Sequence, residues 1–240
     1  MTVYILQPLL DALSLNRKTA HIGFDKLGEE TILFSPEDFD ELNFNSDEDI
    51  VVGGIGYANR AMRKMGLVPP QLDDIPEPLL TFAGRRVWKT TIKTARQQIQ
   101  DGAQFFVKPS SEDQKLFDGC VWSCFRDLIP TAHIPDDTVV ACAEPVNFIA
   151  EYRGFILHGD LINLRPYRGD PLVFPNPDVV RKAMAAYPGP TAFSMDFGVT
   201  DTGETLVVEI NDSYALGAYG LAPISYAKMI RARWNEIRNT

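Results

Sequence analysis

A short proline-rich segment limits the possible folds of this 240-residue chain more than any other feature. The segment PPQLDDIPEP, residues 69–78, contains four prolines and three acidic residues. Proline fixes φ and lacks a backbone N–H, so such a segment can neither continue a helix nor form a central strand. We therefore predict a linker that divides the chain into a small α/β domain, residues 1–76, and a larger α+β domain, residues 77–240.

Apolar runs separated by polar stretches predict regular elements on both sides of this linker. In the first domain they predict strands at 3–6, 31–34 and 50–52 and a helix at 57–65. The glycines of GGIG, after residue 52, fit a strand-to-helix turn and do not match the dinucleotide-binding fingerprint. In the second domain the pattern predicts helices at 88–100 and 176–186, strands at 104–107 and 139–143, hairpins 148–157/161–165 and 192–199/205–210, and a C-terminal helix from Pro223 with Ile224, Ala227, Ile230, Trp234 and Ile237 on its packed face.

Charge and reactive residues argue against several classes of protein. The chain has 32 acidic and 23 basic residues, a net charge of -9, which disfavours nucleic-acid binding through a broad basic face. No apolar run approaches the roughly 18 residues of a spanning helix, and the start MTVYILQPLL lacks the features of a signal peptide. We therefore expect a cytoplasmic protein without a membrane partner. The three cysteines and three histidines lack the spacing of a disulfide framework, a zinc site or a catalytic triad.

The second predicted hairpin carries the most informative polar residues. Side chains alternate between the two faces of a strand, so Asp196 points away from its neighbours while Glu209 and Asn211 share a face. Pairing of the two strands can bring these three side chains together. Two carboxylates and an amide oxygen are hard ligands suited to Mg²⁺. A solvent-exposed hairpin face would explain the same residues.

A lysine at the end of an apolar strand is the second feature. In FFVKP, residues 105–109, Lys108 precedes a polar loop that contains Lys115 and ends at Gly119. Cations at the mouth of such a loop can hold the phosphates of a nucleotide while the loop covers them. A surface lysine at a strand end is the alternative.

The third feature is a proline between two apolar strands, in AEPVNFIAE, residues 143–151. Proline interrupts the strand pairing, and the freed backbone groups beside Glu144 and Val146 can read the edge of an adenine. Glu151 lies seven residues after Glu144, within reach of ribose hydroxyls. A simple crossover with two solvated acids is the alternative.

Taken in this order, the three features resemble the ATP-grasp superfamily of carboxylate–amine ligases over residues 79 to 240, and most closely its small divergent bacterial and phage members. The resemblance implies two α+β subdomains that grip ATP, preceded by a small α/β domain. It implies phosphate binding by Lys108 and Lys115, adenine binding at residues 143–146 and ribose binding by Glu151. The metal-binding set it implies is Asp196, Glu209 and Asn211.

The chain departs from the better-known members at one important position. Two residues before the metal-binding aspartate, where those members often have arginine, this chain has Ser194. We expect another arginine to steady the transferred phosphate, with Arg165 as the first candidate and Arg153 and Arg168 nearby. Lys89 is a provisional match for a second phosphate-binding lysine of the family.

The resemblance implies an ATP- and Mg²⁺-dependent enzyme that joins a carboxylate, activated as an acyl phosphate, to an amine of a small molecule or peptide. The stretch after Asn211, residues 212–220, would form the acceptor side of the site. A kinase on the same scaffold, a nucleotide-binding protein without turnover and an interaction module without a nucleotide are the alternatives. The sequence identifies neither the substrates nor the oligomeric state.

Overall fold

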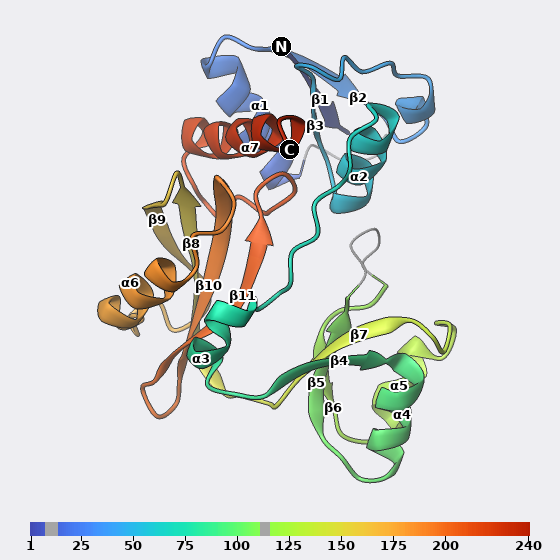
Figure 1. Cartoon of the computed structure of the whole chain (residues 1–240), viewed down its shortest axis with the longest axis vertical. Helices are drawn as coiled ribbons and strands as arrows, with labels where there is room; N and C mark the ends of the chain where they lie inside the picture. The colour runs from blue at the N-terminus through green and yellow to red at the C-terminus, as the bar shows by residue number, and fades with distance from the viewer. Residues whose placement is uncertain (8–13, 111–115) are drawn as a thin grey trace.

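A computed structural model describes residues 1–7, 14–110 and 116–240. The described chain forms three sheets, each with helices against it (Figure 1). Short helical turns connect the larger elements at η1 (Asp38–Asp40), η2 (Glu77–Leu79), α3 (Leu80–Ala83) and η3 (Ile129–Thr131). No helix in these described ranges has the length and apolar character needed to cross a bilayer.

The N-terminal sheet is parallel, with strand order β2-β1-β3. Its strands are β1 (Thr2–Leu6), β2 (Glu30–Phe34) and β3 (Ile50–Val52), which confirms the three predicted strands. Helix α2 (Ile55–Lys64) follows the glycine turn, as predicted. Helix α1 (Leu15–Lys26) was not predicted, because only Ala20, Gly23 and Phe24 of its twelve residues are buried and the apolar pattern is correspondingly weak.

The second sheet is antiparallel, with order β4-β7-β5-β6, and we call it the small-subdomain sheet. It contains β4 (Val87–Thr91), β5 (Phe105–Pro109), β6 (Cys120–Trp122) and β7 (Val139–Ala143), with α4 (Ile92–Gln100) and α5 (Phe125–Leu128) beside it. The predicted helix 88–100 is wrong over its first four residues. The run VWKTT favours a strand because its residues are largely aromatic or β-branched, and Thr91 then caps α4 by accepting a hydrogen bond from the N–H of Thr94.

The third sheet is also antiparallel, with order β11-β10-β8-β9, and we call it the large-subdomain sheet. It confirms both predicted hairpins, as β8 (Phe148–Leu157) with β9 (Asp160–Gly169) and β10 (Ala192–Thr200) with β11 (Thr205–Asp212). One face packs on α6 (Pro177–Ala186), the predicted capped helix, through Phe193, Met195 and Phe197. The alternate residues of β10, Ser194 and Asp196, therefore point to the opposite face.

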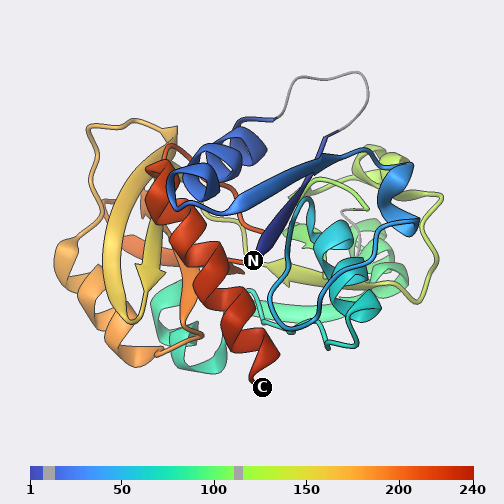
Figure 2. The same cartoon turned by 90° about the horizontal axis from the view of Figure 1, so that it is seen from above.

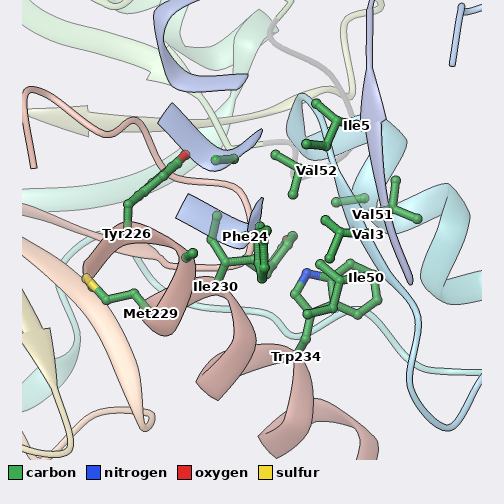
Figure 3. Close-up of a cluster of buried hydrophobic side chains, with 14 of the residues drawn as sticks. Val3, Ile5, Phe24, Ile50, Val51, Val52, Tyr226, Met229, Ile230 and Trp234 are labelled. Carbon is green, nitrogen blue, oxygen red and sulfur yellow. The ribbon is translucent and has the colours of Figure 1, made fainter. Parts of the chain in front are cut away.

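The C-terminal helix α7 (Pro223–Arg238) joins the N-terminal sheet to the rest of the molecule. Its residues Ile230 and Trp234 share one hydrophobic core with Val3, Phe24 and Ile50 (Figure 3). Figure 2 shows α7 lying alongside α1. The predicted packed face is confirmed except at Ile224, which is exposed near the start of the helix. This shared core fixes the N-terminal unit above the large-subdomain sheet.

The contact between α1 and α7 depends on Gly23. A Cβ atom at this position would lie 2.1 Å from the carbonyl oxygen of Pro223. Alanine favours helix by about 1 kcal/mol over glycine, but the clash with rigid backbone outweighs this gain. We expect Gly23→Ala to lower the free energy of unfolding by about 1–3 kcal/mol, measured by urea denaturation. Gly54→Ala is the control, because its Cβ would have no neighbour within 4 Å; equal stability of wild type and Gly23→Ala would contradict the packing.

Candidate active site

A cavity of about 350 Å³ lies between the small-subdomain and large-subdomain sheets. The small-subdomain sheet contributes apolar side chains, and β11 contributes Val208 and Glu209. The segment before α3 closes a further side through Asp73, Asp74 and Ile75. The wall is therefore largely apolar, with charged groups confined to a few positions; the lining includes Leu80, Val87, Trp88, Phe106, Ala141, Cys142, Ala143, Arg85, Lys89 and Lys108.

Lys108 joins the two sheets electrostatically. Strand β5 ends around this residue, and its Nζ lies 2.6 Å from Oε2 of Glu209 and 2.8 Å from Oδ1 of Asp74. Burial lowers the pKa of Lys108, but the two carboxylates more than offset it, so the pKa is raised. Burial likewise raises the pKa of Glu209, whereas Lys108 lowers it, and the net shift is downward. Both groups are therefore charged at neutral pH.

A second ion pair lies on the same face of the large-subdomain sheet. Asp196 on β10 is directly opposite Glu209 on β11 and Arg153 on β8. The guanidinium of Arg153 donates two hydrogen bonds to Asp196, from Nε to Oδ1 at 2.8 Å and from Nη2 to Oδ2 at 2.7 Å. Burial raises the pKa of Asp196 to about 6 even though Arg153 opposes this shift. The side chain of Asp196 is only 1% exposed, so breaking this pair would leave a buried charge without compensation.

Arg153 also links the two carboxylates and two tyrosines. Its Nη2 lies 3.9 Å from Oε1 of Glu209, and its guanidinium carbon lies 4.5 Å from the ring centre of Tyr219. The ring of Tyr219 is 5.3 Å from that of Tyr167. Tyr219 has φ 41°, a conformation that non-glycine residues rarely adopt. This backbone places a half-exposed aromatic ring over the arginine, within the predicted acceptor-side stretch.

Asn211 completes the predicted triplet. Its Nδ2 donates to Oε1 of Glu209 at 3.2 Å, as expected for two residues on one face of a strand. Asn211 lines a second, more polar cavity of about 390 Å³, together with Ser110 and Tyr214. The two cavities share Asp73, Asp74 and Lys89, so they adjoin at the linker.

The structure thus brings together five of the ten residues predicted for the site. Lys108, Arg153, Asp196, Glu209 and Asn211 form a chain of contacts across β5, β8, β10 and β11. This is the arrangement that the hairpin spacing and the lysine at the strand end predicted.

The other predicted residues lie around this group. Arg165 is exposed on β9, directly opposite Arg153 in the strand register. Glu151 is buried, and its carboxylate accepts hydrogen bonds from Tyr167 and Arg168, both at 2.7 Å. Lys115 lies outside the described residues.

The predicted adenine-binding stretch divides between two places. Ala143 lines the main cavity, whereas the Glu144 side chain lines a different cavity and accepts a hydrogen bond from the backbone N–H of Arg86 at 2.9 Å. Val146 is half-buried and follows the end of β7.

Two charged residues of the cavity were not predicted from the sequence. Arg85 donates to the carbonyl oxygens of Ala83, Val207 and Val208, which ties the start of β4 to β11. Asp74 contacts Lys108 from the linker, and its carbonyl oxygen accepts from the N–H of Ile210 at 2.8 Å. The only sequence signal for Asp74 was the acidic pair DD within the prolines, which is equally typical of a solvated linker.

Comparison with known proteins agrees with this geometry. A search of curated proteins returned no significant match. Among solved structures, the chain is similar to the D-alanine–D-alanine ligase of Bacillus anthracis, with TM-score 0.57 and 14% identity over 100% of this chain and 99% of that one. It is also similar to N5-carboxyaminoimidazole synthetase from Staphylococcus aureus complexed with ADP, with TM-score 0.58 and 13% identity over 98% of this chain and 77% of that one. The ATP-grasp ligase PsnB complexed with a minimal precursor has TM-score 0.52 and 15% identity over 95% of this chain and 98% of that one.

At these identities the solved structures establish the fold, and the sequence establishes the family. The family model that matches is described as an ATP-grasp domain, family 2 of its clade, and it covers residues 82–229, which include both sheets around the cavity. The chain therefore belongs to the ATP-grasp superfamily, in this second family of the clade.

Proposed function

We propose that the protein is an ATP- and Mg²⁺-dependent ligase that activates a carboxylate as an acyl phosphate and joins it to an amine. The observation that carries this proposal is the convergence of Lys108, Glu209, Asp196 and Arg153 at one end of an apolar cavity between two sheets. Apolar walls suit a purine ring, and fixed cations at one end suit its phosphates. Family membership supports the same ligand.

The cavity divides naturally between a base and a phosphate chain. In the proposal, Ala143 and the backbone beside Glu144 and Val146 hold the adenine end, and Glu151 contributes at the ribose end. Lys108 lies at the opposite end with Glu209 and binds phosphate oxygens. Lys115 is proposed to act with Lys108 from the following loop.

The donor atoms at the charged end suit Mg²⁺. Among the described residues, no group of three or more histidine, cysteine, aspartate or glutamate side chains is placed to hold a metal ion. The proposed site therefore depends on the amide oxygen of Asn211 beside the carboxylates of Glu209 and Asp196, an all-oxygen set typical of Mg²⁺ sites. Asp196 would share its carboxylate between the ion and Arg153. When bound, Mg²⁺ would neutralise charge on the phosphate oxygens.

The proposed reaction has two displacements. A carboxylate oxygen of the first substrate attacks the γ-phosphorus, and the bond to the β–γ bridging oxygen breaks to release ADP. The amine of the second substrate then attacks the acyl carbon, and phosphate leaves as the C–N bond forms and the nitrogen loses a proton. Arg153 replaces the arginine absent at Ser194, since it lies between Asp196 and Glu209 and can offset the charge of the transferred phosphoryl group. Arg165, opposite Arg153, is proposed to contact the carboxylate substrate.

Lys108→Met should separate phosphate recognition from base recognition. The variant keeps the length of the side chain but removes its charge, so we expect ATP to bind at least about tenfold more weakly while adenosine affinity changes little. Isothermal titration of the two ligands measures both constants. Lys93→Met, at an exposed position of α4, is the control. Equal losses for ATP and adenosine would show that Lys108 supports the fold of the cavity instead.

The reaction class is tested by product analysis. Purified protein is incubated with Mg-ATP and pairs of carboxylates and amines, including amino acids and short peptides, and ADP and products are identified by mass spectrometry. A ligase gives ADP, phosphate and an amide. A released phosphorylated substrate would indicate a kinase, and Mg-ATP binding without ADP formation across the panel would indicate a binding protein.

A further inference from the structure

The acidic pair of the linker faces the two lysines of the cavity. Asp74 lies 2.8 Å from Lys108, and Asp73 lies 2.5 Å from Lys89. All four residues line the main cavity. The proposed nucleotide site is therefore already neutralised by carboxylates that belong to the chain itself.

The two pairs differ in strength because they differ in exposure. The Lys108 and Asp74 side chains are 21% and 36% exposed, whereas those of Lys89 and Asp73 are 52% and 64% exposed. Exposed ion pairs are screened by water and salt and contribute little, while partly buried pairs are screened less. The contact between Lys108 and Asp74 is thus the stronger of the two.

The backbone also holds Asp74 in place. The N–H of Ile210 donates to the carbonyl oxygen of Asp74 at 2.8 Å, which fastens the linker to β11 one residue after Glu209. A free side chain would lose much of its conformational freedom on reaching Lys108, but this anchored one starts close to it. The effective local concentration of the carboxylate near Lys108 is correspondingly high.

We propose that Asp74, with a smaller contribution from Asp73, is an internal competitor that occupies the phosphate-binding lysines and sets the affinity of the cavity for nucleoside triphosphates. This inference rests on the proposed function, because it requires phosphates to bind at Lys108. One cationic group cannot hold both a carboxylate and a phosphate at full strength, so a bound triphosphate displaces Asp74 from Lys108. The linker thereby couples occupation of the cavity to the position of the segment that joins the N-terminal sheet to the two ATP-grasp sheets.

Asp74→Asn tests the competition because it keeps the side-chain shape and removes the charge. We expect ATP to bind about tenfold more tightly, with adenosine affinity unchanged, since adenosine has no phosphate to compete with Asp74. Asp73→Asn should tighten ATP binding by less than about threefold, because its pair is exposed. Isothermal titration with ATP, ADP and adenosine, each with and without Mg²⁺, measures these changes.

The matched control is Asp178→Asn, which removes the same charge from an exposed pair with Arg181 on α6. It corrects for the general effect of net charge on binding of an anion. Unchanged or weaker ATP binding in Asp74→Asn, with clear binding to wild type, would overturn the inference alone; a weakening limited to Mg-ATP would show that Asp74 is instead a ligand of the ion. Absence of ATP binding to wild type and to every variant would overturn the proposed function and the inference with it.

Discussion

Arg153→Met is expected to lower the free energy of unfolding by about 3–5 kcal/mol, because it leaves the buried Asp196 carboxylate without its partner. Asp196 is 1% exposed and both of its oxygens accept hydrogen bonds from Arg153. Urea denaturation followed by circular dichroism measures the loss. Arg181→Met, which breaks an exposed pair on α6, should change stability by less than about 1 kcal/mol.

A double variant separates the structural role of Arg153 from its proposed catalytic role. Arg153→Met combined with Asp196→Leu replaces the buried ion pair by apolar side chains and should recover most of the lost stability. The same double variant should show no ADP formation, because both the cation and a metal ligand are absent. If it folds and retains turnover, the pair only stabilises the fold. Arg153→Lys, which retains charge but lacks the planar fork, should fold more stably than Arg153→Met and still react slowly.

Glu209→Gln is expected to weaken binding of Mg-ATP by about a hundredfold or more while binding of ATP without Mg²⁺ changes far less. Glu209 contacts Lys108, Asn211 and Arg153, so its charge is central to the cluster. A neutral amide is a poorer ligand for Mg²⁺ than a carboxylate. Titration calorimetry at fixed free Mg²⁺ measures the change.

The stability of Glu209→Gln needs a separate measurement. Its side chain is 26% exposed, so we expect a moderate loss from the unpaired Lys108, well below that of Arg153→Met. Glu204→Gln, at the exposed β10–β11 turn, is the control. Equal affinity of wild type and Glu209→Gln for Mg-ATP would exclude Glu209 as a metal ligand.

Most of the sheet architecture could be predicted from the sequence because the strands are apolar and the turns carry glycine or proline. The pairing of Asp196 with Glu209 followed from strand alternation and a short turn, and the register confirms it. The start of α4 was predicted too early because helical spacing continues back through 88–91, where β-branched and aromatic residues pair with β7 instead.

The parts that could not be predicted depend on contacts between distant segments. Arg153 and Asp196 are 43 residues apart, and Asp74 lies in the linker whereas Lys108 lies on β5, so no local pattern pairs them. From the sequence, Arg165 ranked above Arg153 as the replacement for the missing arginine. The register shows why the order reverses in our proposal, since Arg153 lies on β8, next to β10, whereas Arg165 lies one strand further out on β9.

The most direct test of the account is the thermal stability of the wild-type protein with ATP, with and without Mg²⁺. A ligand that binds only the folded state stabilises it by about 2.7 kcal/mol at a hundred times its dissociation constant, and no second substrate is needed. The account predicts that Tm rises with ATP, rises further with Mg-ATP and changes little with the same concentration of Mg²⁺ alone. An unchanged Tm at millimolar Mg-ATP would contradict the proposal that this cavity binds a nucleotide.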